Sequence, residues 1–447
     1  MKRLGILFVL ASMAWFGLAR AQQHDAGLET DREALSRPMA GLTAPERAVF
    51  QQGRSLMRQS WVVAPAGNRE VNGLGPLYNR LACISCHAKN GRGGAPEGPQ
   101  QRMQSMLVRL SVPGLGAHGG PRPHPVYGDQ LNEEGIPGVP GEGRAHIRWV
   151  TSRLTLAGGE RIALRRSRVS FDELGYGPLG PVQVSLRVSP HVAGLGLLET
   201  VPADVLKNLA RATKPDGVRG TLNQVWDISS GKTVPGRFGL KANAPSLRQQ
   251  IAGAFVGDMG ITSDLFPAEN CTPAQIACQQ APSGGHPELT TAQLDSVEFY
   301  LAHLAPPARR QQDTPEVRQG EVLFEKTGCS VCHQPALPGG DHPTYPRLSG
   351  QSVAAYTDLL LHDMGPDLAD RRPDFQASGR QWRTAPLWGL GLLLGINENT
   401  HFLHDGRART AQEAILWHGG EATMARKRYV QLPGEKRRAL LAFLQSL

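Results

Sequence analysis

The sequence predicts a mainly α-helical protein of two related units, the first of which is enlarged by a small β insertion. Three observations support this fold class. A Cys-x-x-Cys-His motif occurs twice, at residues 83–87 and 329–333. A capped helical pattern precedes each motif. Runs with strand-like composition occur in the first unit, at residues 146–150, 153–156 and 182–186.

Each motif has the spacing of a c-type haem attachment site. Two thiols three positions apart on a helical turn can each form a thioether with a haem vinyl group, and the next imidazole can then bind the iron. A redox or zinc dithiol is the alternative for a single motif. Two copies in an exported chain instead favour two covalent haems in two cytochrome-c-like domains. The expected haem-binding residues are Cys83, Cys86, His87, Cys329, Cys332 and His333.

The first 21 residues are organised as a secretory signal peptide. Lys2 and Arg3 precede an apolar run over residues 4–18, and residues 19–21 form an Ala-x-Ala cleavage site. The run is short for a membrane span, and no comparably apolar stretch follows it. We therefore expect a soluble periplasmic protein that begins near Gln22.

The chain of 447 residues carries a formal net charge of +9. Loss of Lys2, Arg3 and Arg20 with the signal peptide would leave 9 − 3 = +6. The basic residues are scattered and no nucleic-acid module is present, so nucleic acid is not an expected partner. A solvated surface is the simpler interpretation of the charge, and a docking face for an acidic redox partner is the alternative.

The first unit begins after a lead-in over residues 22–43. A Thr-Ala-Pro-Glu sequence at residues 43–46 is a capping box with an early proline, and it predicts a helix to about Trp61. An apolar helical pattern over residues 297–304 closes the unit. The first domain is therefore expected to cover residues 44–305.

The second unit repeats this order after a linker of residues 306–313, which is rich in Pro and Arg. Asp-Thr-Pro-Glu at residues 313–316 predicts the helix before the second motif. A Gly-Leu-Gly-Leu-Leu segment at residues 194–198 recurs at residues 389–393. The second domain is expected to cover residues 314–447.

Two cysteines lie outside the motifs. Cys271 and Cys278 are seven positions apart in a loop rich in Pro, Ala and Gln. An oxidising compartment favours a local disulfide between them, and two free thiols are the alternative.

Long segments around the motifs resemble one known family. They include residues 72–77, 357–365, 382–386 and 417–422. On these segments nearly the whole mature chain resembles the bacterial di-haem oxidoreductases described as "putative peroxidases", and it is distantly similar to di-haem cytochrome c peroxidases. The resemblance implies a C-terminal haem that relays electrons to an N-terminal haem, where peroxide is reduced. A small cytochrome or copper protein would be the electron donor.

The resemblance also implies an axial ligand for the second iron. The wider superfamily places this ligand, usually Met, fourteen positions after the His of a His-Asp-Gly motif. Here His404 begins the motif and His418 occupies that position. The second iron would then have His333 on one side and His418 on the other, and imidazole in place of a thioether lowers the iron potential. A structural histidine is the alternative. Residues 399–401 lack the proline of the peroxidases' calcium site, so calcium is not expected there.

The sixth position at the first iron decides the function, and no candidate ligand has a compelling spacing. Peroxide chemistry needs an acid–base group, and the resemblance implies this role for Glu199, which follows the first Gly-Leu-Gly-Leu-Leu segment. A surface or ion-paired glutamate is the alternative. The candidate sixth ligands are His118, His124, His146, His191, Met103, Met106 and Met259.

Two other functions remain open from the sequence. If protein ligands cap both irons, the chain is a non-enzymatic electron-transfer cytochrome. A haem oxidase or oxygenase of an organic or protein substrate is the third hypothesis, because haem supplies the reactivity and the pocket sets its use. Trp382 and Trp388 are candidates for an inter-haem electron route or for core packing. His404 and Arg407 are expected near the haems or in the turn before the last helices.

Overall fold

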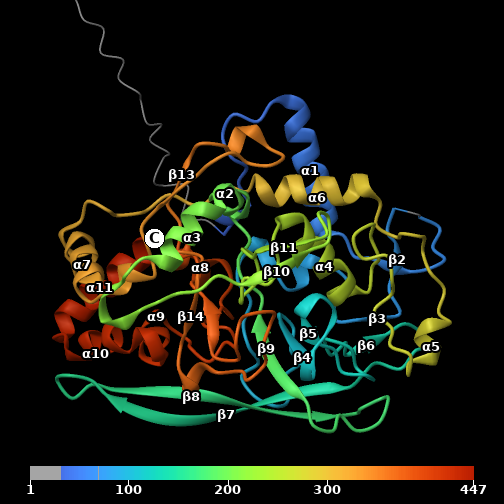
Figure 1. The fold of residues 1–447 in the computed structure, drawn as a ribbon, viewed down its shortest axis with the longest axis horizontal. Coiled ribbons are helices and arrows are strands. Elements are labelled where there is room, and N and C mark those ends of the chain that lie inside the picture. Colours follow the sequence, from blue (N-terminus) through green and yellow to red (C-terminus); the bar gives the residue numbers. More distant parts are fainter. Residues whose placement is uncertain (1–31, 69) are drawn as a thin grey trace, which may run out of the picture.

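The computed structural model describes residues 32–68 and 70–447 (Figure 1). The expected signal peptide, residues 1–21, and the first part of the lead-in lie outside these residues. The described part begins with a short 3-10 helix, η1 (Ala34–Ser36). Within the described part, no helix is both long and apolar enough to cross a membrane.

Two pairs of helices give the two halves of the chain the same framework. α1 (Ala44–Arg58) packs against α6 (Thr291–Ala302), and α7 (Pro315–Lys326) packs against α11 (Gly434–Ser446). The predicted capping box at Thr43 is present at the start of α1. The two helices expected before the motifs are therefore confirmed.

A glycine allows each pair to cross closely. A Cβ atom at Gly53 of α1 would collide with the carbonyl oxygen of Ser296 in α6. A Cβ atom at Gly320 of α7 would collide in the same way with the carbonyl oxygen of Ala439 in α11. The repeat seen in the sequence thus has the same helix crossing in both halves.

The repeated Gly-Leu-Gly-Leu-Leu segment also takes the same form twice. Gly194, with φ +78°, precedes α2 (Leu195–Thr200), and Gly389, with φ +75°, precedes the 3-10 helix η9 (Leu390–Leu392). Both first glycines have the left-handed conformation that glycine adopts without a steric cost. η9 continues into α8 (Leu393–Ile396).

The remaining helices connect these frameworks. Short 3-10 turns carry the two motifs, η2 (Cys83–Ser85) and η6 (Cys329–Val331). The other α-helices are α3 (Ala203–Arg211), α4 (Leu247–Met259), α5 (Ile276–Gln279), α9 (Ala411–Trp417) and α10 (Thr423–Gln431).

The β structure is more extensive than predicted. β4 (Met106–Leu115) pairs antiparallel with β9 (Gln183–Val188) and with β5 (Pro121–Arg122). β7 (Arg144–Thr155) and β8 (Arg161–Asp172) form a hairpin of two 12-residue strands. The two strands predicted at residues 146–150 and 153–156 are therefore one strand, and the third predicted strand corresponds to β9.

Five two-stranded ladders complete the β structure. They pair β1 (Val62–Val63) with β2 (Asn72–Leu74), β3 (Leu77–Tyr78) with β6 (Glu134–Gly135), β10 (Gln224–Asp227) with β11 (Lys232–Pro235), β12 (Leu337–Pro338) with β13 (Ser352–Val353), and β14 (Leu361–Asp363) with β15 (Gln381–Arg383).

The predicted fold class, mainly α with two cytochrome-c-like domains, is wrong. Helix accounts for 32% and strand for 20%, so the protein is mixed α and β, and the described residues show no cytochrome-c domains. The error has a physical cause. Most of the ladders have strands of two to four residues, which are too short to give a period-two pattern in the sequence.

The β7–β8 hairpin lies across one face of the molecule, below both halves as drawn in Figure 1. Arg165 of β8 donates hydrogen bonds to the carbonyl oxygens of Gly406 and Arg407, each at 3.2 Å. At the hairpin tip, Arg437 of α11 pairs with Glu160 at 2.6 Å. The insertion therefore joins the first half of the chain to the second.

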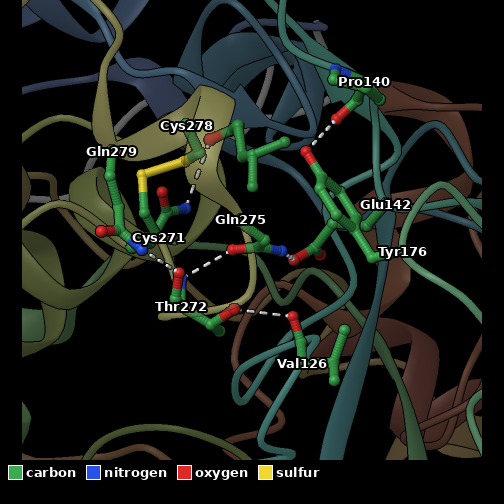
Figure 2. Close-up of a disulfide and its surroundings, with 11 residues drawn as sticks. Val126, Pro140, Glu142, Tyr176, Cys271, Thr272, Gln275, Cys278 and Gln279 are labelled. Carbon is green, nitrogen blue, oxygen red and sulfur yellow. Dashed lines mark hydrogen bonds between the residues drawn. A yellow bond between two sulfur atoms is a disulfide. The ribbon is translucent and has the colours of Figure 1, made fainter.

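Cys271 and Cys278 form the predicted disulfide, with Cα atoms 5.7 Å apart (Figure 2). Gln275, inside the loop that the disulfide closes, donates a hydrogen bond to the buried carboxylate of Glu142. The loop is thereby tied to the segment before β7.

Candidate functional site

The first Cys-x-x-Cys-His motif forms a tight 3-10 turn. The backbone N–H groups of Cys86 and His87 both donate to the carbonyl oxygen of Cys83, at 3.1 and 2.9 Å. Burial, together with the charge of Asp258, raises the pKa of both thiols to about 12. Both cysteines are therefore neutral thiols in the protein chain alone.

The imidazole of His87 is oriented by the backbone. Its Nδ1 lies 2.8 Å from the carbonyl oxygen of Pro190. Because a carbonyl oxygen can only accept, Nδ1 carries the proton and Nε2 keeps its lone pair. Burial lowers the pKa of His87 to about 4. This is the arrangement in which histidine binds metals, with one nitrogen fixed by a hydrogen bond and the other free.

The second motif repeats this arrangement. The N–H of His333 donates to the carbonyl oxygen of Cys329 at 3.0 Å, and His333 Nδ1 donates to that of Tyr356 at 3.0 Å. Burial and the neighbouring His418 lower the pKa of His333 to about 4. His333 is thus also a neutral imidazole with a free Nε2.

His418 follows α9 directly and has the same hydrogen-bond pattern. Its Nδ1 donates to the carbonyl oxygen of Ala414 at 2.7 Å, one turn earlier. Burial lowers the pKa of His418. His418 lines the same cavity as Cys329, Cys332 and His333. The structure therefore brings together the residues that the sequence predicted for the second haem.

This cavity has a volume of about 260 Å³ and a largely apolar lining. Aromatic and aliphatic side chains from both halves surround the two histidines and two cysteines. The apolar lining residues include Phe324, Leu387, Trp388, Leu390, Leu393 and Phe402.

Two buried arginines line the same cavity. Arg92 donates to the carbonyl oxygens of His401 and Leu403, and Arg383 donates to that of Gly239. Burial lowers the pKa of each guanidinium to about 10. In residues 32–68 and 70–447, neither arginine has an ion pair with a carboxylate. A flat apolar macrocycle that carries two propionates matches this lining, so the residues present fit a haem.

A family model described as "Di-haem oxidoreductase, putative peroxidase" matches residues 23–113 and 180–447. The chain belongs to this di-haem oxidoreductase family. The family implies that it binds haem. The unmatched interval, residues 114–179, contains the β7–β8 hairpin.

Other comparisons add little to this identification. In the comparison with curated proteins, no protein matches this chain. Among solved structures, the chain is similar to hydrazine synthase of Kuenenia stuttgartiensis, with 14% identity and a TM-score of 0.36 over 100% of both chains. A likeness at this TM-score supports no argument about fold or activity.

A buried group of charged side chains lies beside Cys332 in the di-haem oxidoreductase. His362 Nδ1 is 2.8 Å from Glu421 Oε2 and 3.7 Å from the Cys332 sulfur, and its Nε2 is 3.0 Å from Asp358 Oδ2. Lys214 also pairs with Asp358, at 3.0 Å. Since each ring nitrogen of His362 faces a carboxylate, both carry protons and His362 is an imidazolium.

The sequence Asp-Met-Gly occurs at residues 258–260 and 363–365, and each copy lies beside one of the two motifs. Asp258, in the first segment, raises the pKa of the thiols of the first motif. His362, directly before the second segment, contacts Cys332 of the second motif. The sequence repeat at these positions therefore marks the surroundings of the cysteines.

The His-Asp-Gly motif combines both predicted roles. His404 lines the cavity, and Trp382 and Trp388 line it as well. Arg407 instead fixes the turn, because its guanidinium pairs with the buried Asp405 at 2.8 Å.

The candidate sixth ligands of the first iron lie in different surroundings. Both ring nitrogens of His124 and of His146 are engaged in hydrogen bonds. His118 is exposed and stacks on Trp226. His191 lines the cavity of the second motif, and its buried Nδ1 has no hydrogen-bond partner among the described residues. The methionines are buried among apolar side chains: Met103, Met106 and Met259.

Glu199, at the end of α2, takes part in a local hydrogen-bond network. Its Oε1 accepts from the N–H of Leu247 at 3.0 Å, and its Oε2 lies 3.4 Å from His342 Nε2. Glu199 does not line the cavity of the second motif. These contacts are sufficient for Glu199 to have a structural role. A catalytic role for Glu199 stays a prediction.

Sequence reasoning missed the charged residues around the cysteines and the cavity. Arg383 lies within the Trp-Arg-Thr-Ala-Pro segment, and His362 within the segment at residues 357–365, so both were on matched segments without an assigned role. Arg92 stands between two glycines after the first motif. An arginine at such a position gives no signal of burial, because burial depends on contacts made 300 residues away.

Proposed function

We propose that this di-haem oxidoreductase is a periplasmic, peroxidase-like enzyme. In this proposal Cys83 and Cys86 hold one haem and Cys329 and Cys332 hold the other, each through two thioethers. Electrons enter at the C-terminal haem, and peroxide is reduced at the N-terminal haem. The observation that carries the proposal is the shared state of His87, His333 and His418, whose Nδ1 atoms donate to backbone carbonyls while Nε2 stays free.

The different surroundings of the two motifs support the division of roles. His333 and His418 line one cavity. If both bound the same iron, no position would be left there for peroxide. Among the candidate sixth ligands of the first iron, His124 and His146 lack a free nitrogen and His191 lines the cavity of the second motif, which favours an open position beside His87. A bound haem supplies the iron that exchanges electrons and, where a position is open, accepts an oxidant.

The reaction sets further demands on the protein. Reduction of one hydrogen peroxide to two waters consumes two electrons and two protons. A neighbouring acid–base group must move a proton between the two oxygen atoms. Glu199 is the candidate from the family resemblance, and its hydrogen bond with Leu247 would have to break for it to act.

The β7–β8 hairpin suits an acidic electron donor. Residues 144–172 contain seven arginines and two acidic residues, a net charge of +5. Arg148 and Arg168 are exposed and lie directly opposite each other, without an ion pair in the described part of the chain. Like charges at opposed positions destabilise a hairpin. Val150, 46% exposed, adds an apolar contact on the same face. We therefore propose that a small acidic redox protein docks there.

Electron paramagnetic resonance and a turnover assay test the proposal. The haem-loaded protein is measured fully oxidised and half-reduced, and then assayed with peroxide and reduced small cytochromes. A high-spin ferric signal from one haem together with peroxide consumption is expected. Two low-spin signals in both states, without peroxide turnover, would instead identify an electron carrier. A stable dioxygen complex without peroxide turnover would identify an oxidase or oxygenase.

A further inference from the structure

A second cavity, of about 380 Å³, lies next to the disulfide loop. It shares no lining residue with the cavity of the second motif. Its wall comes from residues 123–132, from Gly257 at the end of α4, and from residues 269–273. Neither the family match nor the proposed function assigns a role to it.

Many polar side chains in this wall already have partners. His124 uses both ring nitrogens, and Thr272 donates its hydroxyl to the carbonyl oxygen of Val126 at 2.9 Å (Figure 2). Asp129 pairs with Arg109 at 2.7 Å, and this ion pair balances the charge of both side chains. These groups are not available to a ligand.

Three oxygen atoms in the wall remain without a partner. Gln130 Oε1, Glu269 Oε2 and Asn270 Oδ1 are buried and accept no hydrogen bond from the residues that the structure describes. Gln130 is only 2% exposed, and its Nε2 donates to the carbonyl oxygen of Gly257 at 2.6 Å. Asn270 Nδ2 likewise donates to Leu77. Both amides are therefore fixed with their oxygens free.

We propose that this cavity binds a hard divalent cation of the calcium class through Gln130 Oε1, Glu269 Oε2 and Asn270 Oδ1. A buried acceptor without a partner destabilises the fold, and all three unpartnered side-chain atoms of this wall are acceptors. Calcium accepts carboxylate, amide and water oxygens in flexible geometry, whereas magnesium requires a near-ideal octahedron. One carboxylate in the site corresponds to weak binding, with Kd on the order of 10⁻⁴–10⁻³ M.

Glu269 is the one carboxyl group among the three proposed ligands. Burial and the charge of the neighbouring Glu288 raise its pKa, because both disfavour the ionised carboxylate. A cation bound at Oε2 would offset both effects. The other charged groups nearby, Asp129 and Arg109, form an ion pair at 2.7 Å.

The site is connected to the first motif through one side chain. Gln130 Nε2 also donates to Asp258 Oδ1 at 2.9 Å. The charge of the Asp258 carboxylate contributes to the raised pKa of the Cys83 and Cys86 thiols. A bound cation would fix Gln130 and thereby the wall behind this motif. The cation is thus assigned a positioning role and no part in electron transfer.

Calcium titration of the chelator-treated, haem-loaded protein tests the proposal. Isothermal titration calorimetry should give one site, and calcium should raise Tm. Asn270→Ala should weaken binding by about tenfold, which corresponds to ~1.4 kcal/mol. Asn243→Ala is the matched control, because Asn243 Oδ1 is also buried and unpartnered but does not line this cavity. Equal binding by both variants would overturn the proposal.

A measurement on the unchanged protein covers the case in which a variant does not fold. Thermal unfolding of the chelator-treated, haem-loaded protein is followed against calcium and, separately, against magnesium concentration. Calcium should raise Tm in the range of the expected Kd, and magnesium should raise it less, because magnesium requires a near-ideal octahedron. Absence of calcium binding at concentrations well above the expected Kd range would mean that the cavity holds only water. Peroxide turnover does not enter either measurement, so the outcome is independent of the proposed function.

Discussion

Trp382 lies face to face with His404, with ring centroids 3.8 Å apart and ring planes inclined by 7°. Burial lowers the pKa of His404 to about 4, so the stacked imidazole is neutral. Lys241 Nζ lies 4.5 Å from the centroid of the Trp382 ring. The indole N–H donates to the carbonyl oxygen of Leu368 at 2.8 Å. Trp382 is therefore fixed on its faces and at its edge.

Replacement of this indole tests the core-packing role. Trp382→Phe keeps an aromatic face but leaves the Leu368 carbonyl without its donor, so we expect a loss of about 1–3 kcal/mol in unfolding free energy. Urea denaturation followed by circular dichroism measures it. Trp226→Phe is the control, because Trp226 stacks on the exposed His118. Equal losses in both variants would contradict a special role for the buried hydrogen bond.

Removal of His418 should open one iron. In His418→Gly the haem-loaded protein should gain a high-spin ferric signal, and added imidazole should restore the low-spin signal by entering the vacated space. His418→Met should instead raise the reduction potential of that haem, because a thioether ligand stabilises ferrous iron more than an imidazole ligand does. Paramagnetic resonance and a redox titration provide the two readouts. An unchanged spectrum in His418→Gly would show that His418 is a structural histidine.

The charges around His362 should make stability depend on pH. Burial alone would lower the pKa of His362, but its bonds with Asp358, Cys332 and Glu421 raise it to about 11. Its contribution is complete below the unfolded pKa of about 6.5 and is lost as pH rises toward 11. Burial opposes ionisation of Asp358 and Glu421, but His362 and other donors lower each pKa to about 2. Their contribution is present above pH ~4 and is lost as pH falls to 2.

Urea unfolding between pH 3 and 10 checks this dependence. His362→Gln should cost about 3–5 kcal/mol at neutral pH, because two buried carboxylates lose their partner. The variant should also lose the decline in stability that the native protein shows between pH 7 and 10. If the two proteins declined in parallel over that range, another group would be responsible.

The arginine face of the hairpin should determine donor binding. Arg148→Gln combined with Arg168→Gln should raise KM for a succinylated, acidic cytochrome c and should weaken the dependence of its rate on salt, because charge complementarity acts mainly on association. The same change at Lys436 and Arg438, exposed on α11, is the control. Reduction by a small neutral reductant should not change. Equal effects from both double variants would indicate general charge alone.

The helix crossings allow a paired test of the repeat. Gly53→Ala and Gly320→Ala should each cost at least ~1–3 kcal/mol, because the new methyl group collides with a backbone carbonyl of the facing helix. Gly395→Ala in α8 meets no atom within 4 Å and should be neutral or slightly stabilising. Thermal unfolding of the three variants compares them. A tolerated methyl group at either crossing would show that the helices can separate.

The sequence predicted local features where one short pattern determines the structure. The Thr43 capping box and the Cys271–Cys278 disulfide are correct, because each depends on residues a few positions apart. The overall class was not predictable in this way. The five short ladders have strands of two to four residues, and one of them pairs β3 at residues 77–78 with β6 at residues 134–135. No periodic pattern in either strand indicates such pairing.

The same distinction applies to the site. The cysteines and histidines of the motifs were found from their spacing, and His418 from the family resemblance, which places a ligand fourteen positions after His404. Arg92 and His362 were not found, because their burial depends on residues 401–403 and on Glu421. Charged side chains are usually exposed, so a buried one is recognised only after the fold is known.

The contacts of Arg92 and of the hairpin have a consequence for protein engineering. The segment after the first motif binds backbone of the second half, and the hairpin of the first half ends on α11. Neither half is therefore an independent folding unit, although the motifs repeat. A truncated gene that stops at residue 312 should yield an insoluble product. Separate fragments cut at this point should regain a native spectrum only when both are produced in the same cell.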